Sequence, residues 1–449
     1  MSKHVIAPAI GPVDAVERAG FRSRAHASWL VPAVLGGLMV VEGARQGGFW
    51  PADAVVVAVV VIAALVVELL LCPPDRRGWA VLGSVLGLAL LWLVRDIATG
   101  TTSGLLPFGA SILGFGASFV AVRPLSRPQR AVAGQFVSCL GIAGALIGFV
   151  GLIGRRYPMA MPAQGLWRLS TTLTYSDAAG LALAVCLLVS LAGGPRPWIS
   201  RLAVCLCSGG LLAAQSRGAL IACACAVAIV PWAQFRTFRV PLLAGIGLGI
   251  TAVATSTSTG PVAWLAVALV LAVSLALAWP TSGGRRWSSA ATWLGAGGMV
   301  LLLVAASLLV HHELALRALA PSDQDRAAEW TSAFHQFESS PIDGVGPDRI
   351  LYFQAADGDF AHFAHNEYLQ IAADVGLLGL AALAAIGVAL ARTIRRVDLL
   401  TSCSTAALVC WSVGGGFDFD WHLPFIGLLG GWVAGMAATT MKTTTRSRT

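Results

Sequence analysis

The segment of this sequence best able to do chemistry reads His365, Asn366, Glu367, Tyr368, Leu369 and Gln370. Asparagine is a preferred helix N-cap, so Asn366 predicts a helix that starts at Glu367. Glu367, Gln370 and Asp374 then lie on one face of that helix. A histidine just above a carboxylate-bearing face is a candidate general base, because its ordinary pKa lies near neutrality. His365 is that candidate here.

A second polar cluster lies between Asp418 and Pro424. Asp418 and Asp420 are two residues apart and His422 follows them, a spacing that can offer oxygen ligands to a divalent metal. We favour a hydrogen-bonded cluster that closes an outer cavity, and expect no metal or other cofactor. The sequence holds no phosphate-binding loop, no zinc-protease helix and no Gly-x-Ser-x-Gly nucleophile motif.

The composition places these residues in a membrane protein. Hydrophobic residues make up 57% of the 449 residues, charged residues make up 12%, and the mean hydropathy is +0.76. A soluble domain carries about 25% charged residues, so a water-soluble fold would expose too much apolar surface here. These values exclude a soluble enzyme, a nucleic-acid-binding protein and a disordered scaffold. The nine cysteines lie in or beside apolar runs, which is typical of small packing residues.

A helix that crosses a bilayer needs about 20 apolar residues. Fourteen spans are predicted on this basis, near residues 29–46, 54–72, 78–94, 105–122, 132–153, 177–193, 199–214, 218–235, 240–257, 261–280, 288–310, 369–391, 401–415 and 423–439. We therefore expect an all-α polytopic membrane protein with about 12–14 transmembrane helices and one long outer loop that contains short helices. Its expected parts are a cytoplasmic N-terminal segment, a first helix bundle, an outer loop, C-terminal helices and a cytoplasmic tail, at residues 1–28, 29–310, 311–368, 369–439 and 440–449.

Lysine and arginine concentrate in cytoplasmic loops, and this rule orients the spans. With the N-terminus inside, 21 of the 30 basic residues fall in inner segments and nine in outer segments. The sequence therefore predicts a multi-pass protein of the inner (plasma) membrane whose two termini are cytoplasmic.

The outer arginines run against this rule, so a specific anionic partner is expected for them. They include Arg155, Arg156, Arg168, Arg217 and Arg326. One guanidinium group can bind two oxygens of a phosphate through two parallel hydrogen bonds. A pyrophosphate at the outer surface is therefore the natural ligand for such a cluster. Each arginine taken alone can equally form a structural ion pair.

The outer loop also predicts structure of its own. Residues 323–338 read as an amphipathic helix capped by Ser322, with apolar positions at Trp330, Phe334 and Phe337. Gly344 and Gly346 follow in what reads as a tight turn.

Around His365 the sequence resembles the O-antigen ligase family, which includes O-antigen ligases, related polysaccharide polymerases and some protein O-oligosaccharyltransferases. The resemblance covers residues 165–439 as an ordered set of short motifs. They are Arg168-Leu169-Ser170 with Tyr175-Ser176-Asp177, Ser216-Arg217-Gly218, Arg326 with Trp330, Gly344-Val345-Gly346, His365 to Gln370, and Asp418 to Pro424. The sequence departs from the family at Asp374, where glutamate is common.

The resemblance implies a membrane glycosyltransferase of the GT-C-related kind. It would transfer a glycan from a polyprenyl (undecaprenyl) pyrophosphate to an acceptor hydroxyl on the outer face, without a metal and with inversion. Carried over by position, His365 is the base, Arg217 and Arg168 bind the pyrophosphate, and Arg326 is a further candidate. The other expected substrate-binding residues are Tyr175, Asp177, Asn366, Tyr368, Gln370, Asp374, Asp420 and His422.

Three interpretations of the function stay open. The first is a ligase that moves a finished glycan to an acceptor, and the second is a polymerase whose acceptor is another lipid-linked repeat unit. The third is a lipid-glycan transporter or flippase that uses Glu42 and Glu68, carboxylates near or within spans. A transporter of that kind is expected to show internal repeats and charges at the bilayer midplane. Here the charges gather at the outer surface, and no repeat is evident.

Overall fold

The computed structural model describes residues 29–100, 105–163, 165–256, 261–278, 324–347, 353–354, 360–394 and 398–438. Its helices are Trp29–Ala44, α2 (Pro51–Leu71), α3 (Arg76–Thr99), α4 (Leu105–Val122), α5 (Arg127–Gly154), α6 (Ser176–Ser190), α7 (Pro197–Ala214), α8 (Arg217–Val227), α9 (Trp232–Thr237), α10 (Arg239–Ala254), α11 (Pro261–Ala278), α13 (Gln324–Ser339), α14 (Glu367–Thr393), α15 (Leu399–Gly414) and α16 (Pro424–Ala437). The rest is two antiparallel hairpins, β1 (Ala160–Ala163) with β2 (Leu166–Leu169) and β3 (Phe353–Gln354) with β4 (Phe360–Ala361), and the short 3-10 turns η1 (Gln46–Gly48), η2 (Thr171–Leu173) and η3 (Asp420–His422).

These helices confirm the expected class, an all-α polytopic membrane protein. Within the described residues, five helices are long and apolar enough to cross a membrane, and eight shorter helices are also apolar. Together they match thirteen of the fourteen spans expected from hydropathy. The remaining expected span, 288–310, lies outside the described residues, as do Ser322 and the two terminal segments.

The distribution of apolar side chains separates lipid-facing helices from central ones. α2 exposes a row of large apolar side chains, which are Val55, Val56, Val59, Ile62, Val66, Val67 and Leu70. In contrast, every residue of α6 and of α16 is buried. Exposed apolar rows of this kind suit a hydrocarbon solvent, whereas α6 and α16 form the centre of the bundle.

Small residues allow the central helices to approach each other closely. Gly427, Gly431 and Gly435 are spaced by four, so they form one stripe on α16, and that stripe faces α4. A Cβ atom at Gly431 would lie 2.0 Å from the carbonyl oxygen of Phe115 on α4. Glycine stripes of this spacing are typical of tightly packed membrane helices.

The helix α14 is broken at Gly376, whose φ is 69°. The turn at residues 341–346 supplies partners for the backbone groups that the break leaves open. Val345 and Gly346 donate to the carbonyls of Ala373 and Asp374 at 2.8 and 3.0 Å, and Leu377 donates to Pro341 at 2.8 Å. Membrane helices tolerate such breaks only where other protein groups satisfy the backbone. The break therefore fixes the outer loop to α14.

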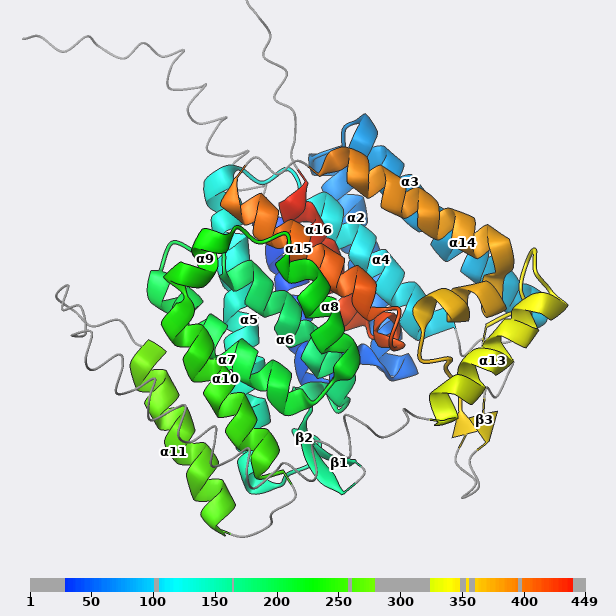
Figure 1. The fold of residues 1–449 in the computed structure, drawn as a ribbon. Helices are drawn as coiled ribbons and strands as arrows, with labels where there is room; N and C mark the ends of the chain where they lie inside the picture. The colour runs from blue at the N-terminus through cyan, green and yellow to red at the C-terminus, as the bar shows by residue number, and fades with distance from the viewer. Residues whose placement is uncertain are drawn as a thin grey trace, which may run out of the picture.

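The two ends of the bundle differ in charge. One end carries the loops that the basic residues predict to be cytoplasmic, and Arg123 pairs there with Asp75 at 2.6 Å. Arg127 pairs with Asp398 at 3.5 Å at the same end. The opposite end holds hairpin β1–β2 and the starts of α6, α8 and α14. In Figure 1, α13 and α14 lie together at one edge of the molecule and α11 lies at the other.

The close approach of α16 to α4 gives a first prediction. Gly431→Ala should destabilise the protein by about 1–3 kcal/mol, because a methyl group has no room beside the carbonyl of Phe115. Gly87→Ala on α3 is the matched control, since no atom lies within 4 Å of a Cβ built there. Thermal unfolding in nanodiscs measures both variants. Equal melting temperatures for the two would contradict this packing.

Candidate active site

Arg168 and Arg326 both reach Asp177, and His365 lies close to Arg326, at the end of the bundle where α6 and α14 begin. Arg217 is the first residue of α8 at the same end. These residues come from segments far apart in the sequence, which are strand β2, the first turns of α6, α8 and α13, and the residue before the cap of α14. The structure therefore gathers most of the residues that sequence reasoning singled out.

Arg168 lies on strand β2 of the first hairpin and points at the first turn of α6. Its Nη2 atom donates to Oδ1 of Asp177 at 2.8 Å. Its Nε atom donates to the carbonyl of Ala214, and Nη2 is also near the carbonyl of Gln215 at 3.4 Å. The hairpin, α6 and the α7–α8 turn are thus joined through one guanidinium group.

Arg326, in the first turn of α13, reaches the turn between α15 and η3. Its Nη1 atom donates to the carbonyl of Phe417 at 2.7 Å, and its Nη2 atom pairs with Asp418 at 3.1 Å. The same Nη2 atom lies 3.9 Å from Asp177. Asp177 therefore lies between Arg168 and Arg326, and the two guanidinium groups share it.

Besides the hydrogen bond from Arg326, Asp418 accepts one from the hydroxyl of Tyr175 at 2.8 Å. Burial and the nearby charge of Asp177 raise the pKa of Asp418 to about 6, although Arg326 opposes this. Burial and the Asp418 carboxylate raise the pKa of the Tyr175 hydroxyl well above its ordinary value. Tyr175 therefore stays protonated and acts as a donor at this position.

His365 is held in a defined orientation by a residue that the sequence did not reveal. Its Nδ1 atom lies 2.7 Å from Oε2 of Glu329 on α13, and Glu329 is only 4% exposed. The ring also meets Phe419 edge to face at 5.1 Å. A carboxylate bound to Nδ1 leaves Nε2 as the nitrogen available for proton transfer.

The backbone at His365 adopts φ of 46°, an uncommon value for a residue with a side chain. The preceding amide, of Ala364, donates to Oε1 of Gln370 at 2.9 Å. Gln370 in turn donates to Asp374 at 2.6 Å, and both are buried. The expected polar face of α14 thus supports the strained turn that presents the histidine.

The pKa of His365 lies above its ordinary value of 6.5. Burial alone would lower it, but the hydrogen bond to Glu329 and the negative charges of Asp418 and Glu329 raise it by more. The positive charge of Arg326 acts in the opposite direction. A histidine in this environment can take and give a proton close to neutral pH.

Arg217 is the first residue of α8 and is exposed. Ser216 caps this helix through a hydrogen bond from Ala219 at 3.2 Å. Gly218 packs so closely on Phe417 that a Cβ atom there would lie 2.6 Å from the Phe417 side chain. Arg217 therefore lies between two turns. One is the α7–α8 turn, which Arg168 contacts at Gln215, and the other follows α15, where Arg326 contacts Phe417.

Two expected substrate-binding residues of the His365 segment have structural partners instead. Asn366 caps α14 as predicted, because its Oδ1 accepts from the amides of Tyr368 and Leu369 at 3.1 Å each. The Tyr368 hydroxyl donates to the carbonyl of Ser412 at 2.7 Å. Both side chains fix α14 against the α15–α16 region.

Asp420 and His422 lie in η3 and are buried. His422 is 3.2 Å from Glu367, which is fully buried and also accepts from the amide of Trp421. Burial and the Asp418 charge raise the pKa of Asp420 well above its ordinary value. Within the part of the chain that the structure describes, no three His, Cys, Asp or Glu side chains are grouped as metal ligands. Asp418 and His422 have hydrogen-bond partners here, which are Tyr175 and Arg326 for Asp418 and Glu367 for His422, whereas Oδ1 of Asp420 is buried without one.

Other outer arginines form ordinary pairs away from this site. Arg45 pairs with Asp53, and Arg95 pairs with Asp343 at 2.7 Å. Arg155 donates to the carbonyl of Thr255. The alternative of a structural ion pair therefore describes Arg45 and Arg95, whereas Arg155 makes a hydrogen bond to a backbone carbonyl.

The expected loop helix forms as α13, and of its three expected apolar positions Trp330 and Phe337 are partly buried whereas Phe334 is exposed. Phe334, predicted as an apolar position, is 49% exposed, whereas Glu329 and Gln336 are 4% and 8% exposed. The buried contact of α13 is centred on Ala333, which packs on Ala364 and Ala373.

Comparison with known proteins agrees with the motifs noted in the sequence. Residues 202–384 match the family model described as O-antigen ligase, and this range contains Arg217, Arg326, Glu329 and His365. A comparison with curated proteins gives no match. The sequence resemblance to this family is therefore confirmed.

The contacts of Arg326 give a second prediction. Arg326→Met should loosen α13 and speed its amide hydrogen exchange by at least about tenfold, because charge-assisted hydrogen bonds contribute about 1.5–3 kcal/mol. Glu338→Gln on the same helix is the control, since its pair with His335 is exposed and contributes about 0–1 kcal/mol. Unchanged exchange in the Arg326 variant would show that α13 is held by other contacts.

Proposed function

Since this chain carries the domain of the O-antigen ligase family, we propose that it is a membrane glycosyltransferase that takes a glycan from a polyprenyl pyrophosphate. The acceptor is a hydroxyl group of a glycan or of a lipid-linked glycan, and transfer takes place at the outer face of the cytoplasmic membrane. Both the ligase and the polymerase activities of the family need this same chemistry.

The observation that carries the proposal is the hydrogen bond between His365 and Glu329, which lies close to Arg326 and Asp418. With Glu329 on Nδ1, the Nε2 atom of His365 is positioned to accept the proton of an acceptor hydroxyl. The hydroxyl oxygen then attacks the anomeric carbon, and the bond from that carbon to the pyrophosphate breaks. Attack from the side opposite the leaving group inverts the anomeric centre.

The arginines supply what the leaving group needs. Pyrophosphate departs readily only if its developing negative charge is neutralised, and fixed guanidinium groups do this without reorganising. Arg168 is held by Asp177 and by backbone carbonyls through Nε and Nη2. Within the described residues its Nη1 atom makes no such bond, so it remains as a donor toward a phosphate oxygen. We assign Arg168 and Arg217 to the pyrophosphate, with Arg326 beside them.

The transporter interpretation finds less support. Glu42 is buried near η1, at the end of the bundle that holds the site, whereas Glu68 is buried in the last turn of α2 at the basic end. A proton-coupled transporter would place such carboxylates together near the bilayer midplane.

The third prediction concerns transfer by the purified protein in nanodiscs, supplied with a polyprenyl-pyrophosphate glycan and a chelator. Wild type should release polyprenyl pyrophosphate. His365→Ala should lose about 10²–10⁴-fold in rate because it removes the base. Arg217→Ala should lose about 10²–10³-fold because it removes one charge-stabilising donor. Release is measured by chromatography of the lipid product.

Product size then distinguishes the two enzymes. A ladder of lengths indicates a polymerase, and a single addition to a foreign acceptor indicates a ligase. Arg45→Ala is the matched arginine control, since its partner is Asp53 rather than a site residue. Full activity of the His365 and Arg217 variants, or a proton-driven movement of lipid-linked glycan without release, would overturn the proposal.

The fourth prediction is a shift in the pH dependence of transfer. A neutral His365 is the active form, so the rate falls as pH drops through its raised pKa. Glu329→Gln removes a hydrogen-bond partner and a negative charge that raise this pKa, so the acid limb should move to lower pH. Glu338→Gln, exposed on the same helix, should leave the limb in place. An acid limb that stays fixed in Glu329→Gln would assign it to another group.

A further inference from the structure

The turn at residues 341–346, which fixes the outer loop to α14, leaves one large apolar side chain uncovered. Ile342 is 65% exposed, although its backbone is held at the break in α14. Its carbonyl accepts from the amide of Leu378 at 3.2 Å, and Leu377 donates to the carbonyl of Pro341. Leu377 and Leu378 are exposed as well. Three uncovered apolar residues, one of them from the outer loop, therefore lie close together.

An exposed apolar row on α3 leads to the same place. Its members are spaced by three and four residues, so they form one stripe on the helix, and they are Leu86, Leu90, Val94 and Ile97. Arg95, at the end of this row, donates to Asp343 at 2.7 Å and also to the carbonyl of Gly344. The turn therefore lies at the level where the stripe ends.

The distance from the basic end of the bundle indicates where this level lies in a bilayer. Arg77, near the start of α3, donates to the carbonyl of Arg392, near the end of α14, at 3.0 Å. Basic residues at helix ends mark the polar boundary of a membrane. Arg95 lies about 27 Å further along α3, and Leu377 lies about 22 Å back along α14, at about 1.5 Å per residue. Both values fall within a hydrocarbon thickness of about 30 Å, and helix tilt shortens them along the membrane normal.

We propose that Ile342, together with Leu377 and Leu378, contacts the acyl chains of the leaflet nearest the candidate active site. The outer loop then touches the bilayer itself as well as the helix bundle. Hydrocarbon is the solvent that suits exposed apolar side chains at this level. The pair between Arg95 and Asp343 fits the polar boundary beside this contact, because charged groups in membranes are usually paired.

The contact has a consequence for the candidate active site. The turn follows α13, and Glu329 lies about 15 Å back along that helix from its last residue, Ser339, at about 1.5 Å per residue. Glu329 holds His365 through the Nδ1 atom. A turn fixed at the edge of the hydrocarbon therefore keeps both side chains near the membrane surface.

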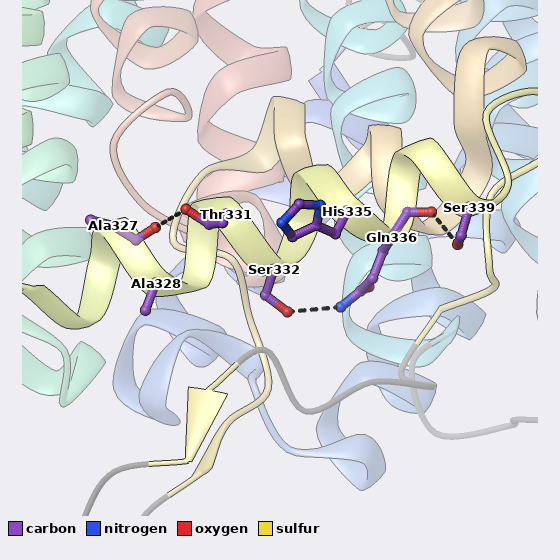
Figure 2. Close-up of a pocket in the computed structure, with 7 residues that line it drawn as sticks. All are labelled: Ala327, Ala328, Thr331, Ser332, His335, Gln336 and Ser339. Carbon is purple, nitrogen blue, oxygen red and sulfur yellow. Dashed lines mark hydrogen bonds between the residues drawn. The ribbon is translucent and has the colours of Figure 1, made fainter.

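Another side of α13 is polar and supplies a control position. Figure 2 shows Thr331, His335 and Ser339 along the helix, spaced by four residues, and all three are exposed. The Thr331 hydroxyl donates to the carbonyl of Ala327 at 2.8 Å. This row suits water, so Thr331 is the matched control for Ile342.

The test replaces Ile342, Leu378 or Thr331, one at a time, by the photo-reactive residue benzoylphenylalanine. Each protein is held in nanodiscs of phosphatidylglycerol and phosphatidylethanolamine, and mass spectrometry after irradiation identifies what is bonded to the new residue. We expect a phospholipid adduct at position 342 in a yield like that at position 378, and no such adduct at position 331. A lipid adduct at 378 without one at 342 would overturn the inference. So would an adduct of position 342 with a second copy of the chain, because that would identify a protein interface.

Hydrogen exchange gives a second measurement that is independent of glycan transfer. Ile342→Asp should speed the amide exchange of α13 in nanodiscs by about tenfold, because a charge is costly at the edge of the hydrocarbon. Ile342→Leu keeps an apolar side chain and should leave the exchange unchanged, as should Thr331→Asp. Equal exchange in Ile342→Asp and wild type would show that the turn does not rest on lipid.

Discussion

The sharing of Asp177 between Arg168 and Arg326 is the interaction on which the rest of the site depends. It joins a hairpin, the first turn of α6 and the outer helix α13, which lie far apart in the sequence. Asp418 extends the network to the turn before α16. Buried charges are costly unless they are paired, so removing one member leaves its partner uncompensated. The network thus fixes the geometry of the site more than it adds to stability.

The break in α14 also fixes the geometry of the site, through backbone hydrogen bonds rather than ion pairs. A continuous helix would satisfy its own backbone and would give the outer loop nothing to bind. Because Gly376 interrupts the helix, amides and carbonyls become available, and the turn at residues 341–346 pairs with them. This turn directly follows α13, so it sets where Glu329 stands relative to His365. A backbone irregularity inside a membrane helix therefore positions a side-chain contact outside it.

Much of this architecture could be predicted from sequence, and the exceptions have physical causes. Hydropathy located the helices because a bilayer imposes length and apolarity on each span, and Asn366 marked the start of α14. The hairpin that carries Arg168 was not predicted, since its short strands have no strong periodicity. Glu329 was missed because it meets His365 across 36 residues of chain. Phe334 on α13 was expected to be buried but is exposed, because the contact of α13 with α14 is made through Ala333.

The electrostatic balance of the site sets a condition on any anion that binds it. At rest, Arg168 and Arg326 are already paired with carboxylates, so a pyrophosphate must compete with Asp177 and Asp418 for them. Asp418 can give up its charge by taking up a proton, because burial and the nearby charge of Asp177 raise its pKa to about 6. A second negative charge nearby raises that pKa further. Proton uptake by Asp418 would then release Arg326 to the anion, while Asp177 keeps Arg168 in position.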